Sequence, residues 1–186
     1  MNLDKDKIER AISMILEAIG EDTEREGLKD TPERISNMYE EIFQGMNMTG
    51  SDVLGTTFSI DNDNIIIEKD IEFYSMCEHH MLPFFGKINI AYIPNKKVAG
   101  LSKLARLCDI HSRRLQLQER LTNGIARDLY KELGAKGVMV IAQATHLCMS
   151  MRGVKKYDAK TKTMAALGLL RDDLNLREEA LKLISD

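Results

Sequence analysis

Residues 77–80 read Cys-Glu-His-His, which places a thiol and two imidazoles in one short run. The run directly follows a hydrophobic segment of the kind that forms a strand. Cys and His are ligands that a zinc-like divalent ion prefers. If the segment is extended, Cys77 and His79 share one face, whereas a turn after Cys77 lets Cys77 and His80 bind one ion. A buried cysteine beside two surface histidines is the alternative without a metal.

A second pair of such ligands, His146 and Cys148, lies on another strand-like run, where alternate side chains face the same side. Because the chain holds only four histidines and three cysteines, two separated clusters favour a shared metal site over coincidence. A tetrahedral site with two cysteines and one histidine leaves a fourth position for water and spares a histidine for proton transfer. A closed structural site would instead use four ligands and would leave no spare histidine.

Two basic side chains, Lys103 and Arg106, lie near the start of a predicted helix over 101–112. The positive end of the helix dipole, with two cations on one side, suits a phosphate group, and a solvated basic face is the alternative. Cys108 lies on the apolar face of the same helix, so we expect it in the core. His111 has no partner at metal-binding spacing, and we expect a structural role for it.

Gln118 and Glu119 open a second, longer helix near 116–133. A carboxylate held there can accept two neighbouring N–H donors, such as those on the amino and ring N–H edge of guanine. A carboxylate that only stabilises the N-terminus of a helix is the alternative. Arg152, just beyond the second ligand pair, adds a cation close to the candidate metal.

The segments that must position these residues change from helical to strand-like periodicity along the chain. Apolar spacing predicts a helix over 3–19, and a second helix begins with Thr31 as its N-cap and Pro32 in its first turn. After a polar connection with one short strand near 57–60, the remaining strands are predicted at 65–67, 71–74, 86–93, 138–142, 145–151 and 163–170. The helix pair lies between them, and a last helix is predicted over 175–184. This order predicts an α+β fold with an antiparallel sheet.

The composition limits the classes of function. With 186 residues, 44% of them hydrophobic, the chain can bury a core and form one domain with a helical arm. A net charge of −3 gives no basic field for general nucleic-acid binding. We expect no membrane span and no secretory signal, because no apolar run is long enough and the first residues are charged. Three cysteines fit free thiols or metal ligands in the cytoplasm, where we expect the protein to act.

Five segments together resemble the GTP cyclohydrolase I family: 31–34, 72–80, 98–106, 113–122 and 146–153. The likeness covers residues 27–184. It implies a tunnelling fold, in which antiparallel sheets and helix pairs assemble into a ring. It also implies an N-terminal helical arm at 1–50, a catalytic domain at 51–186, and a homodecamer with active sites between subunits.

The resemblance further implies a reaction in which GTP and water give 7,8-dihydroneopterin triphosphate and formate, the first step of tetrahydrofolate biosynthesis. Water activated by zinc (Zn²⁺) attacks carbon 8 of guanine, and ring opening, sugar rearrangement and re-cyclisation follow. Carried over position by position, the zinc ligands are Cys77, His80 and Cys148.

The same resemblance assigns the remaining roles. His146 is implied as acid and base at the adjacent ring nitrogen, His79 assists ring opening, and Ser102 acts in the sugar rearrangement. The implied ligands of the substrate are Glu119 and Gln118 for guanine, and Lys103, Arg106, Arg152 and Arg34 for the triphosphate.

The chain departs from the family pattern at two places. Asn37 stands where a lysine is frequent, and Met164 and Leu167 lie in a run that usually has a serine and often an arginine. Both changes remove polar contacts near the phosphate end, so triphosphate affinity is the property that they affect. Two other hypotheses are a non-catalytic purine or pterin-binding module with a structural zinc, and a related enzyme acting on a deazaguanine, which would lack the paired zinc clusters.

Overall fold

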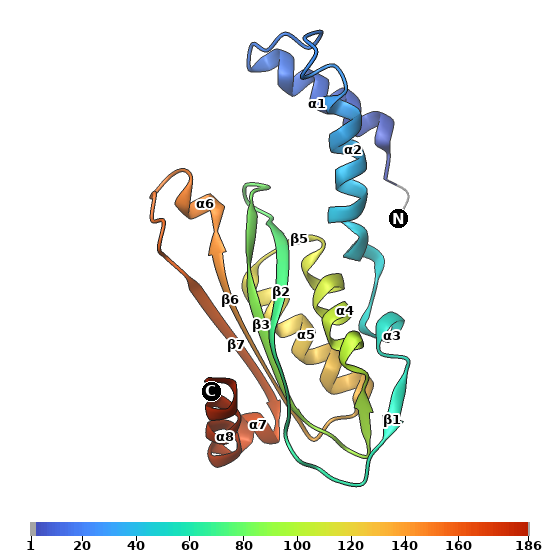
Figure 1. The fold of residues 1–186 in the computed structure, drawn as a ribbon, viewed down its shortest axis with the longest axis vertical. Coiled ribbons are helices and arrows are strands. Elements are labelled where there is room, and N and C mark those ends of the chain that lie inside the picture. The colour runs from blue at the N-terminus through green and yellow to red at the C-terminus, as the bar shows by residue number, and fades with distance from the viewer. Residues whose placement is uncertain (1–2, 186) are drawn as a thin grey trace.

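The computed structural model describes residues 3–185, and it consists of a protruding helical arm and a body built on one sheet (Figure 1). The arm is a pair of helices, α1 (Lys5–Ala18) and α2 (Thr31–Ile42), which pack against each other. The Asp4 carboxylate caps α1 by accepting a hydrogen bond of 3.0 Å from the backbone N–H of Lys7. Every described residue of α1 stays at least partly exposed, because the arm stands away from the body.

The start of α2 differs by one residue from the prediction. Asp30 is the N-cap, and Thr31, which was predicted as the cap, is already in the first turn with Pro32. The Thr31 hydroxyl donates back to the carbonyl of Gly27, at 3.3 Å, and so does not accept from the helix. Proline is suited to this first turn because its missing N–H has no partner there in any helix.

The connection from the arm to the body contains three short elements: η1 (Gln44–Asn47), α3 (Gly50–Val53) and β1 (Thr57–Ser59). The strand agrees with the prediction, and it pairs antiparallel with β4 (Lys97–Ala99). The two helices were not predicted, because a single turn is too short to display a hydrophobic period. The N–H of Gly50 donates to the carboxylate of Asp128 at 3.0 Å, which fixes α3 to the body.

The main sheet has five strands in the order β5 (Leu115–Gln116), β2 (Ile66–Cys77), β3 (Pro83–Ile93), β6 (Gly137–His146) and β7 (Thr161–Gly168). Neighbouring strands are antiparallel, except that β5 runs parallel to the end of β2. The segments 65–67 and 71–74, predicted as separate strands, belong to one strand. A bulge lies between Glu68 and Ile71, with Asp70 at a φ of 57°, and it interrupts the alternation on which the prediction relied.

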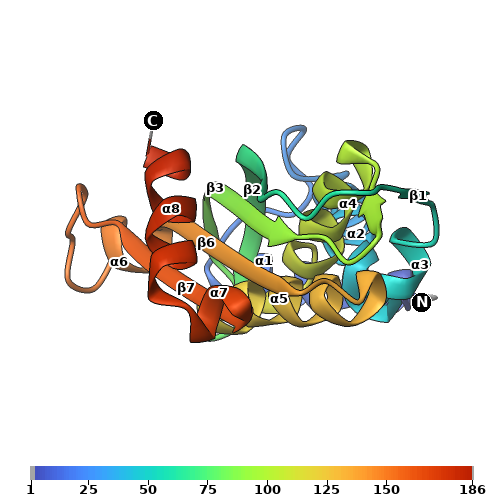
Figure 2. The ribbon, with the colours of Figure 1, turned by 90° about the horizontal axis from the view of Figure 1, so that it is seen from below.

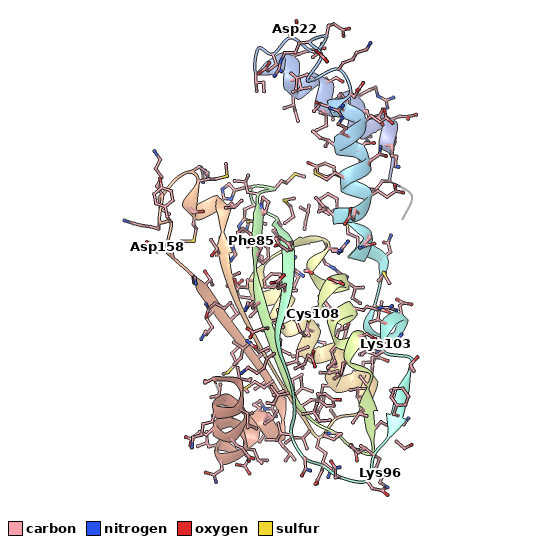
Figure 3. All side chains as sticks on the ribbon, in the orientation of Figure 1. Asp22, Phe85, Lys96, Lys103, Cys108 and Asp158 are labelled. Atoms are coloured by element: carbon pink, nitrogen blue, oxygen red, sulfur yellow. The ribbon has the colours of Figure 1, made fainter. Side chains whose placement is uncertain are left out.

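Two helices, α4 (Leu101–Ser112) and α5 (Gln118–Leu133), cover one face of this sheet, and both agree with the sequence prediction (Figure 1). α5 ends at Gly134, whose φ of 59° is the left-handed conformation that glycine adopts easily. The core between sheet and helices includes these fully buried side chains: Phe84, Ile88, Ile90, Leu104, Leu107, Cys108, Leu121, Ile125, Leu129, Val138 and Val140. Cys108, labelled in Figure 3, is thus a core residue as predicted, and burial raises the pKa of its thiol.

The opposite face of the sheet is covered only in part. The short helix α7 (Leu169–Asp172) and the last helix α8 (Leu174–Ser185) pack there through a smaller cluster: Ala91, Ile93, Met139, Ile141, Leu170 and Ala180. Figure 2 shows α8 on the opposite side of the sheet from α4. An α+β fold with an antiparallel sheet and a helix pair on one side is therefore confirmed. Within residues 3–185, no helix has both the length and the apolar character that crossing a membrane requires.

Candidate functional site

The Cys-Glu-His-His run forms the loop between β2 and β3. Cys77 is the last residue of β2, and its N–H donates to the carbonyl of Leu82 at 2.9 Å. The carbonyl of Cys77 accepts from the N–H of Met81 at 2.8 Å, and Met81 adopts a φ of 51°. The chain therefore turns after Cys77, and of the two arrangements considered from the sequence, it is the turn that brings Cys77 and His80 together.

The second ligand pair lies where β6 leaves the sheet. His146 is the last residue of β6, and Cys148 lies in a single helical turn, α6 (Leu147–Ser150). The predicted strand over 145–151 is therefore wrong beyond His146. Because β6 pairs with β3 through His146 and Phe84, the start of α6 lies next to the β2–β3 loop.

Three side chains converge at this end of the sheet. The ligand atoms of Cys77, His80 and Cys148 all lie within 4.8 Å of one another. Two sulfur atoms and one imidazole nitrogen form a donor set that zinc binds tetrahedrally, with a fourth position left for water. Burial and the neighbouring Cys77 raise the pKa of the Cys148 thiol, so a cation that binds here displaces thiol protons. The donors therefore fit a divalent metal that prefers sulfur and nitrogen.

His79 and Arg152 lie at the rim of this cluster. His79 is exposed, and its ring stands edge-on to that of His80, with the centroids 6.3 Å apart. One guanidinium nitrogen of Arg152, Nη1, lies 3.3 Å from Nε2 of His80. A cation thus stands beside the metal donors, as the sequence predicts, and both rim residues are open to a bound molecule.

The imidazole of His146 is held on two sides. Its ring stacks on Phe84, with the centroids 4.6 Å apart and the planes 1° from parallel, and its Nε2 lies 2.8 Å from Oε1 of Gln118. Burial lowers the pKa of His146, whereas the carboxylate of Glu119 acts in the opposite direction. An imidazole that is neutral near pH 7 can accept a proton and return it.

The two residues that open α5 differ in exposure. Glu119 is exposed, so its carboxylate can meet a ligand. Gln118 is only 2% exposed, and the hydrogen bonds of its amide go to groups of the same chain. Sequence reasoning treated the two as neighbours at one ligand edge, because periodicity does not reveal which residue of a first helical turn faces the core.

An ion pair that sequence analysis did not single out ties the metal loop to α5. The guanidinium of Arg120 donates to both carboxylate oxygens of Glu78, at 2.6 and 3.1 Å. Glu78 lies within the Cys-Glu-His-His run and Arg120 directly follows Glu119, so both residues belong to segments that the sequence marks as functional. Their pairing joins distant parts of the chain, which spacing alone cannot show.

Two of the four basic residues predicted to bind the triphosphate, Lys103 and Arg106, line a different cavity. Lys103 and Arg106 contribute to a space of about 260 Å³ between α4 and the connection that carries η1 and α3, together with Arg113. Figure 3 labels Lys103 on this side of α4. Asp52 and Asp109 also line the cavity, so its charge is mixed.

Ser102, Lys103 and Arg106 lie in the N-terminal half of α4, whereas it is the C-terminal end of this helix that lies near the metal loop. The Ser75 hydroxyl on β2 donates to the carbonyl of Ser112 at 2.7 Å, which places the last residue of α4 close to Cys77. With about 1.5 Å of rise per residue, Ser102 lies roughly 15 Å further along the axis. One chain therefore does not bring the short side chain of Ser102 to its own metal donors.

The remaining candidates lie on α2 and β7. Arg34 is exposed on α2 and forms an ion pair within the arm. Asn37, on the same helix, accepts a hydrogen bond of 3.0 Å from the ammonium group of Lys5, so a cation lies beside this amide. On β7, Met164 is exposed, whereas Leu167 packs against the core.

A family model described as GTP cyclohydrolase I matches residues 8–185. The chain belongs to the GTP cyclohydrolase I family. It is 58% identical over 182 residues to the GTP cyclohydrolase 1 of Finegoldia magna, an alignment that covers 98% of this chain and 99% of that protein. The GTP cyclohydrolase 1 proteins of Clostridium perfringens and Streptococcus sanguinis are each 52% identical, again over 98% of this chain and 99% of theirs. The family resemblance of the five sequence segments is therefore confirmed.

Among solved structures, an archaeosine synthase QueF-like protein in its apo form aligns with a TM-score of 0.46 and 15% sequence identity. That alignment covers 58% of this chain and 97% of the other.

Proposed function

We propose that this chain is a zinc-dependent GTP cyclohydrolase I, which converts GTP and water into 7,8-dihydroneopterin triphosphate and formate. The observation that carries the proposal is the convergence of Cys77, His80 and Cys148 in a chain of this family. Three protein donors leave a position open for a reactant, as in catalytic rather than structural zinc sites. The bound ion supplies a Lewis acid that activates water near neutral pH.

The side chains around the metal donors suit proton transfer to a purine ring. Burial lowers the pKa of His146, which favours the neutral imidazole, and its ring is half-buried and stacked on Phe84, so it can move a proton at the ring nitrogen beside carbon 8. His79 is exposed next to His80, where it can assist the opening of the ring. Glu119 is exposed at the start of α5 and offers two acceptor oxygens to the amino and ring N–H groups of guanine.

The cations are proposed to hold the triphosphate. Arg152 lies beside the metal donors, whereas Lys103 and Arg106 line the cavity near the start of α4. Arg34 is the fourth candidate, and Ser102 is proposed to act in the sugar rearrangement. Four cations spread over three elements match the length and charge of a triphosphate better than a single phosphate.

We propose in addition that the enzyme is a homodecamer whose active sites lie between subunits. The separation of roughly 15 Å along α4 supports active sites between subunits, because Ser102 lies too far along the helix to act at the metal donors of its own chain. The edge of β2 before Met76 and the outer edge of β7 have no strand partner within residues 3–185, and such edges accept a further strand. The division into an arm at 1–50 and a catalytic domain at 51–186, and action in the cytoplasm, where GTP is found, belong to this proposal.

The test is turnover of GTP by the purified protein loaded with zinc. The expected products are formate and a pterin that fluoresces after oxidation, with zinc bound at one equivalent per chain. The alternative, a purine-binding module with a structural zinc, predicts tight binding of GTP without products and no effect of His146→Ala. Absence of both products from fully loaded protein would contradict the proposed activity.

A further inference from the structure

The amide of Gln118 is buried between α5 and the last two strands of the sheet. Its Nε2 lies 3.0 Å from the carbonyl oxygen of Ala142, 3.1 Å from that of Thr161, and 3.1 Å from the hydroxyl of Thr163. Backbone carbonyl oxygens can only accept hydrogen bonds. The atom that faces them must therefore be the nitrogen of the amide, and this fixes which way the group is turned.

The neighbouring hydroxyls agree with this orientation. Thr122 donates to the backbone carbonyl of Gln118 at 2.8 Å, and its Oγ1 lies 2.6 Å from that of Thr163. With the Thr122 proton used in this way, Thr163 donates to Thr122 and accepts from the amide. The two protons of the Gln118 amide are thus surrounded by three acceptors, so turning the amide over would break several hydrogen bonds at once.

The fixed amide presents its oxygen to His146. Oε1 of Gln118 lies 2.8 Å from Nε2 of His146, and an amide oxygen has no proton to donate. The proton of this hydrogen bond must therefore lie on Nε2. Stacking on Phe84 keeps the imidazole from tilting out of its plane, and the hydrogen bond to Gln118 restrains its rotation within that plane.

We propose that Gln118 is a positioning residue that keeps a proton on Nε2 of His146, so that Nδ1 is the nitrogen that exchanges protons with the substrate. The exchange of protons rests on the proposed function, whereas the position of the resting proton does not. This assigns to Gln118 a role through His146 and not the direct contact with guanine that the resemblance implies. A neutral imidazole with one nitrogen occupied presents a single basic site to the ring nitrogen of the substrate.

The first experiment places the proton in the wild-type, metal-loaded protein. Nitrogen-15 NMR of histidine-labelled protein, recorded at about pH 8, distinguishes protonated from unprotonated ring nitrogens. The chain has four histidines, and the signals of His146 are those lost in His146→Gln. We expect a protonated Nε2 and an unprotonated Nδ1. A proton on Nδ1, alone or in addition, would overturn the proposal, and this measurement requires neither GTP nor a folded variant of Gln118.

The second experiment asks whether Gln118 holds that proton. Neutral imidazole in water already favours a proton on Nε2, so the decisive quantity is the rate at which this proton exchanges with solvent. Gln118→Met should speed the exchange strongly. Gln116→Met is a matched control, because Gln116 is also buried and its amide bonds to backbone groups of His111 and Leu117. Equal exchange rates in wild type and Gln118→Met would contradict the proposal.

Kinetics separate positioning from direct binding. Misplacement of the imidazole should lower kcat for GTP on the order of 10²-fold in Gln118→Met, with a smaller change in KM. A raised KM with unchanged kcat would instead identify a direct contact with the substrate and overturn the positioning role. If the wild-type protein proves inactive, the proposed function fails, while the NMR result still decides the place of the proton.

Discussion

The two ends of the helix pair α4 and α5 differ in how completely one chain builds them. At the metal end, the side chains orient one another: Gln118 contacts His146, Arg120 contacts Glu78, and Arg152 contacts His80. At the start of α4, the candidate groups point into solvent or line an open cavity. The difference teaches that one chain suffices to arrange the candidate metal donors and His146, whereas on the proposed function Ser102 would act on a substrate held at the metal donors of another copy.

The largest expected effect is the loss of bound zinc and of GTP turnover when one of the metal donors is replaced. Cys77→Ser removes one of three donors, so bound zinc should fall well below one equivalent per chain. GTP turnover should fall by more than the roughly 10- to 100-fold that is typical of changes outside the ligand set. Metal analysis and a formate assay on the same preparation measure both quantities.

Cys108→Ala is the matched control for this variant. It also removes a buried thiol, but from the hydrophobic core, where the resulting cavity should cost about 1 kcal/mol of stability. Its zinc content should equal that of the wild type. Loss of zinc in Cys108→Ala, or its retention in Cys77→Ser, would contradict the assignment of the donors.

The second prediction tests whether the two ends meet across subunits. Cys77→Ser and Lys103→Glu should each have little activity as pure proteins, one lacking the metal and the other a phosphate contact. In oligomers mixed from equal amounts of both chains, roughly a quarter of the sites between subunits combine two intact halves. Activity should therefore reappear on co-expression, measured as formate release per site.

A mixture with activity no greater than the average of the two pure variants would show that both ends act within one chain. Co-expression of Cys77→Ser with His80→Asn is the control, because both changes affect the same end and no site can be restored.

A smaller effect is expected from the ion pair that links the metal loop to α5. Glu78 and Arg120 are both partly exposed, so solvent screens their attraction. A double-mutant cycle with Glu78→Gln and Arg120→Gln should give a coupling free energy of at most about 1 kcal/mol in the free energy of unfolding. Chemical denaturation of the metal-free proteins measures it, and additive effects of the two changes would show that the pair does not contribute.

The smallest expected effect concerns His111, whose Nε2 lies 2.9 Å from the carboxylate of Asp128. The pKa of His111 is lowered, mainly by burial; the Asp128 carboxylate acts in the opposite direction, and the cations Arg114 and Arg127 add to the lowering. The unfolded chain therefore binds this proton more readily, and stability falls as the pH drops below about 6.5. His111→Gln keeps an N–H donor but does not titrate, so its denaturation midpoint should decline less between about pH 7 and pH 5 than that of the wild type. An equal decline would contradict this origin of the pH dependence.

A feature of this fold or site could be predicted from the sequence where it depends on residues close together in the chain, and not where it depends on contacts between distant segments. The helices around Leu104 and Ile125 and the cysteine–histidine clusters follow from periodicity and ligand chemistry over a few residues. The single turn at Cys148 was mistaken for a strand, because four residues show no period. The contacts of Gln118 join α5 to two strands much further along the chain, and only the packed fold decides that this side chain points inward.

The complete burial of Cys108 lets thiol reactivity report on the proposed metal site alone. A thiol reagent added to native protein cannot reach Cys108, whose thiol is also kept protonated by its surroundings. The other two cysteines of the chain are the two sulfur donors, and of these Cys148 is the more exposed. Any thiol that reacts before the protein unfolds therefore belongs to a site without its metal. A colorimetric thiol reagent can therefore follow the metal content of each preparation while the protein stays folded.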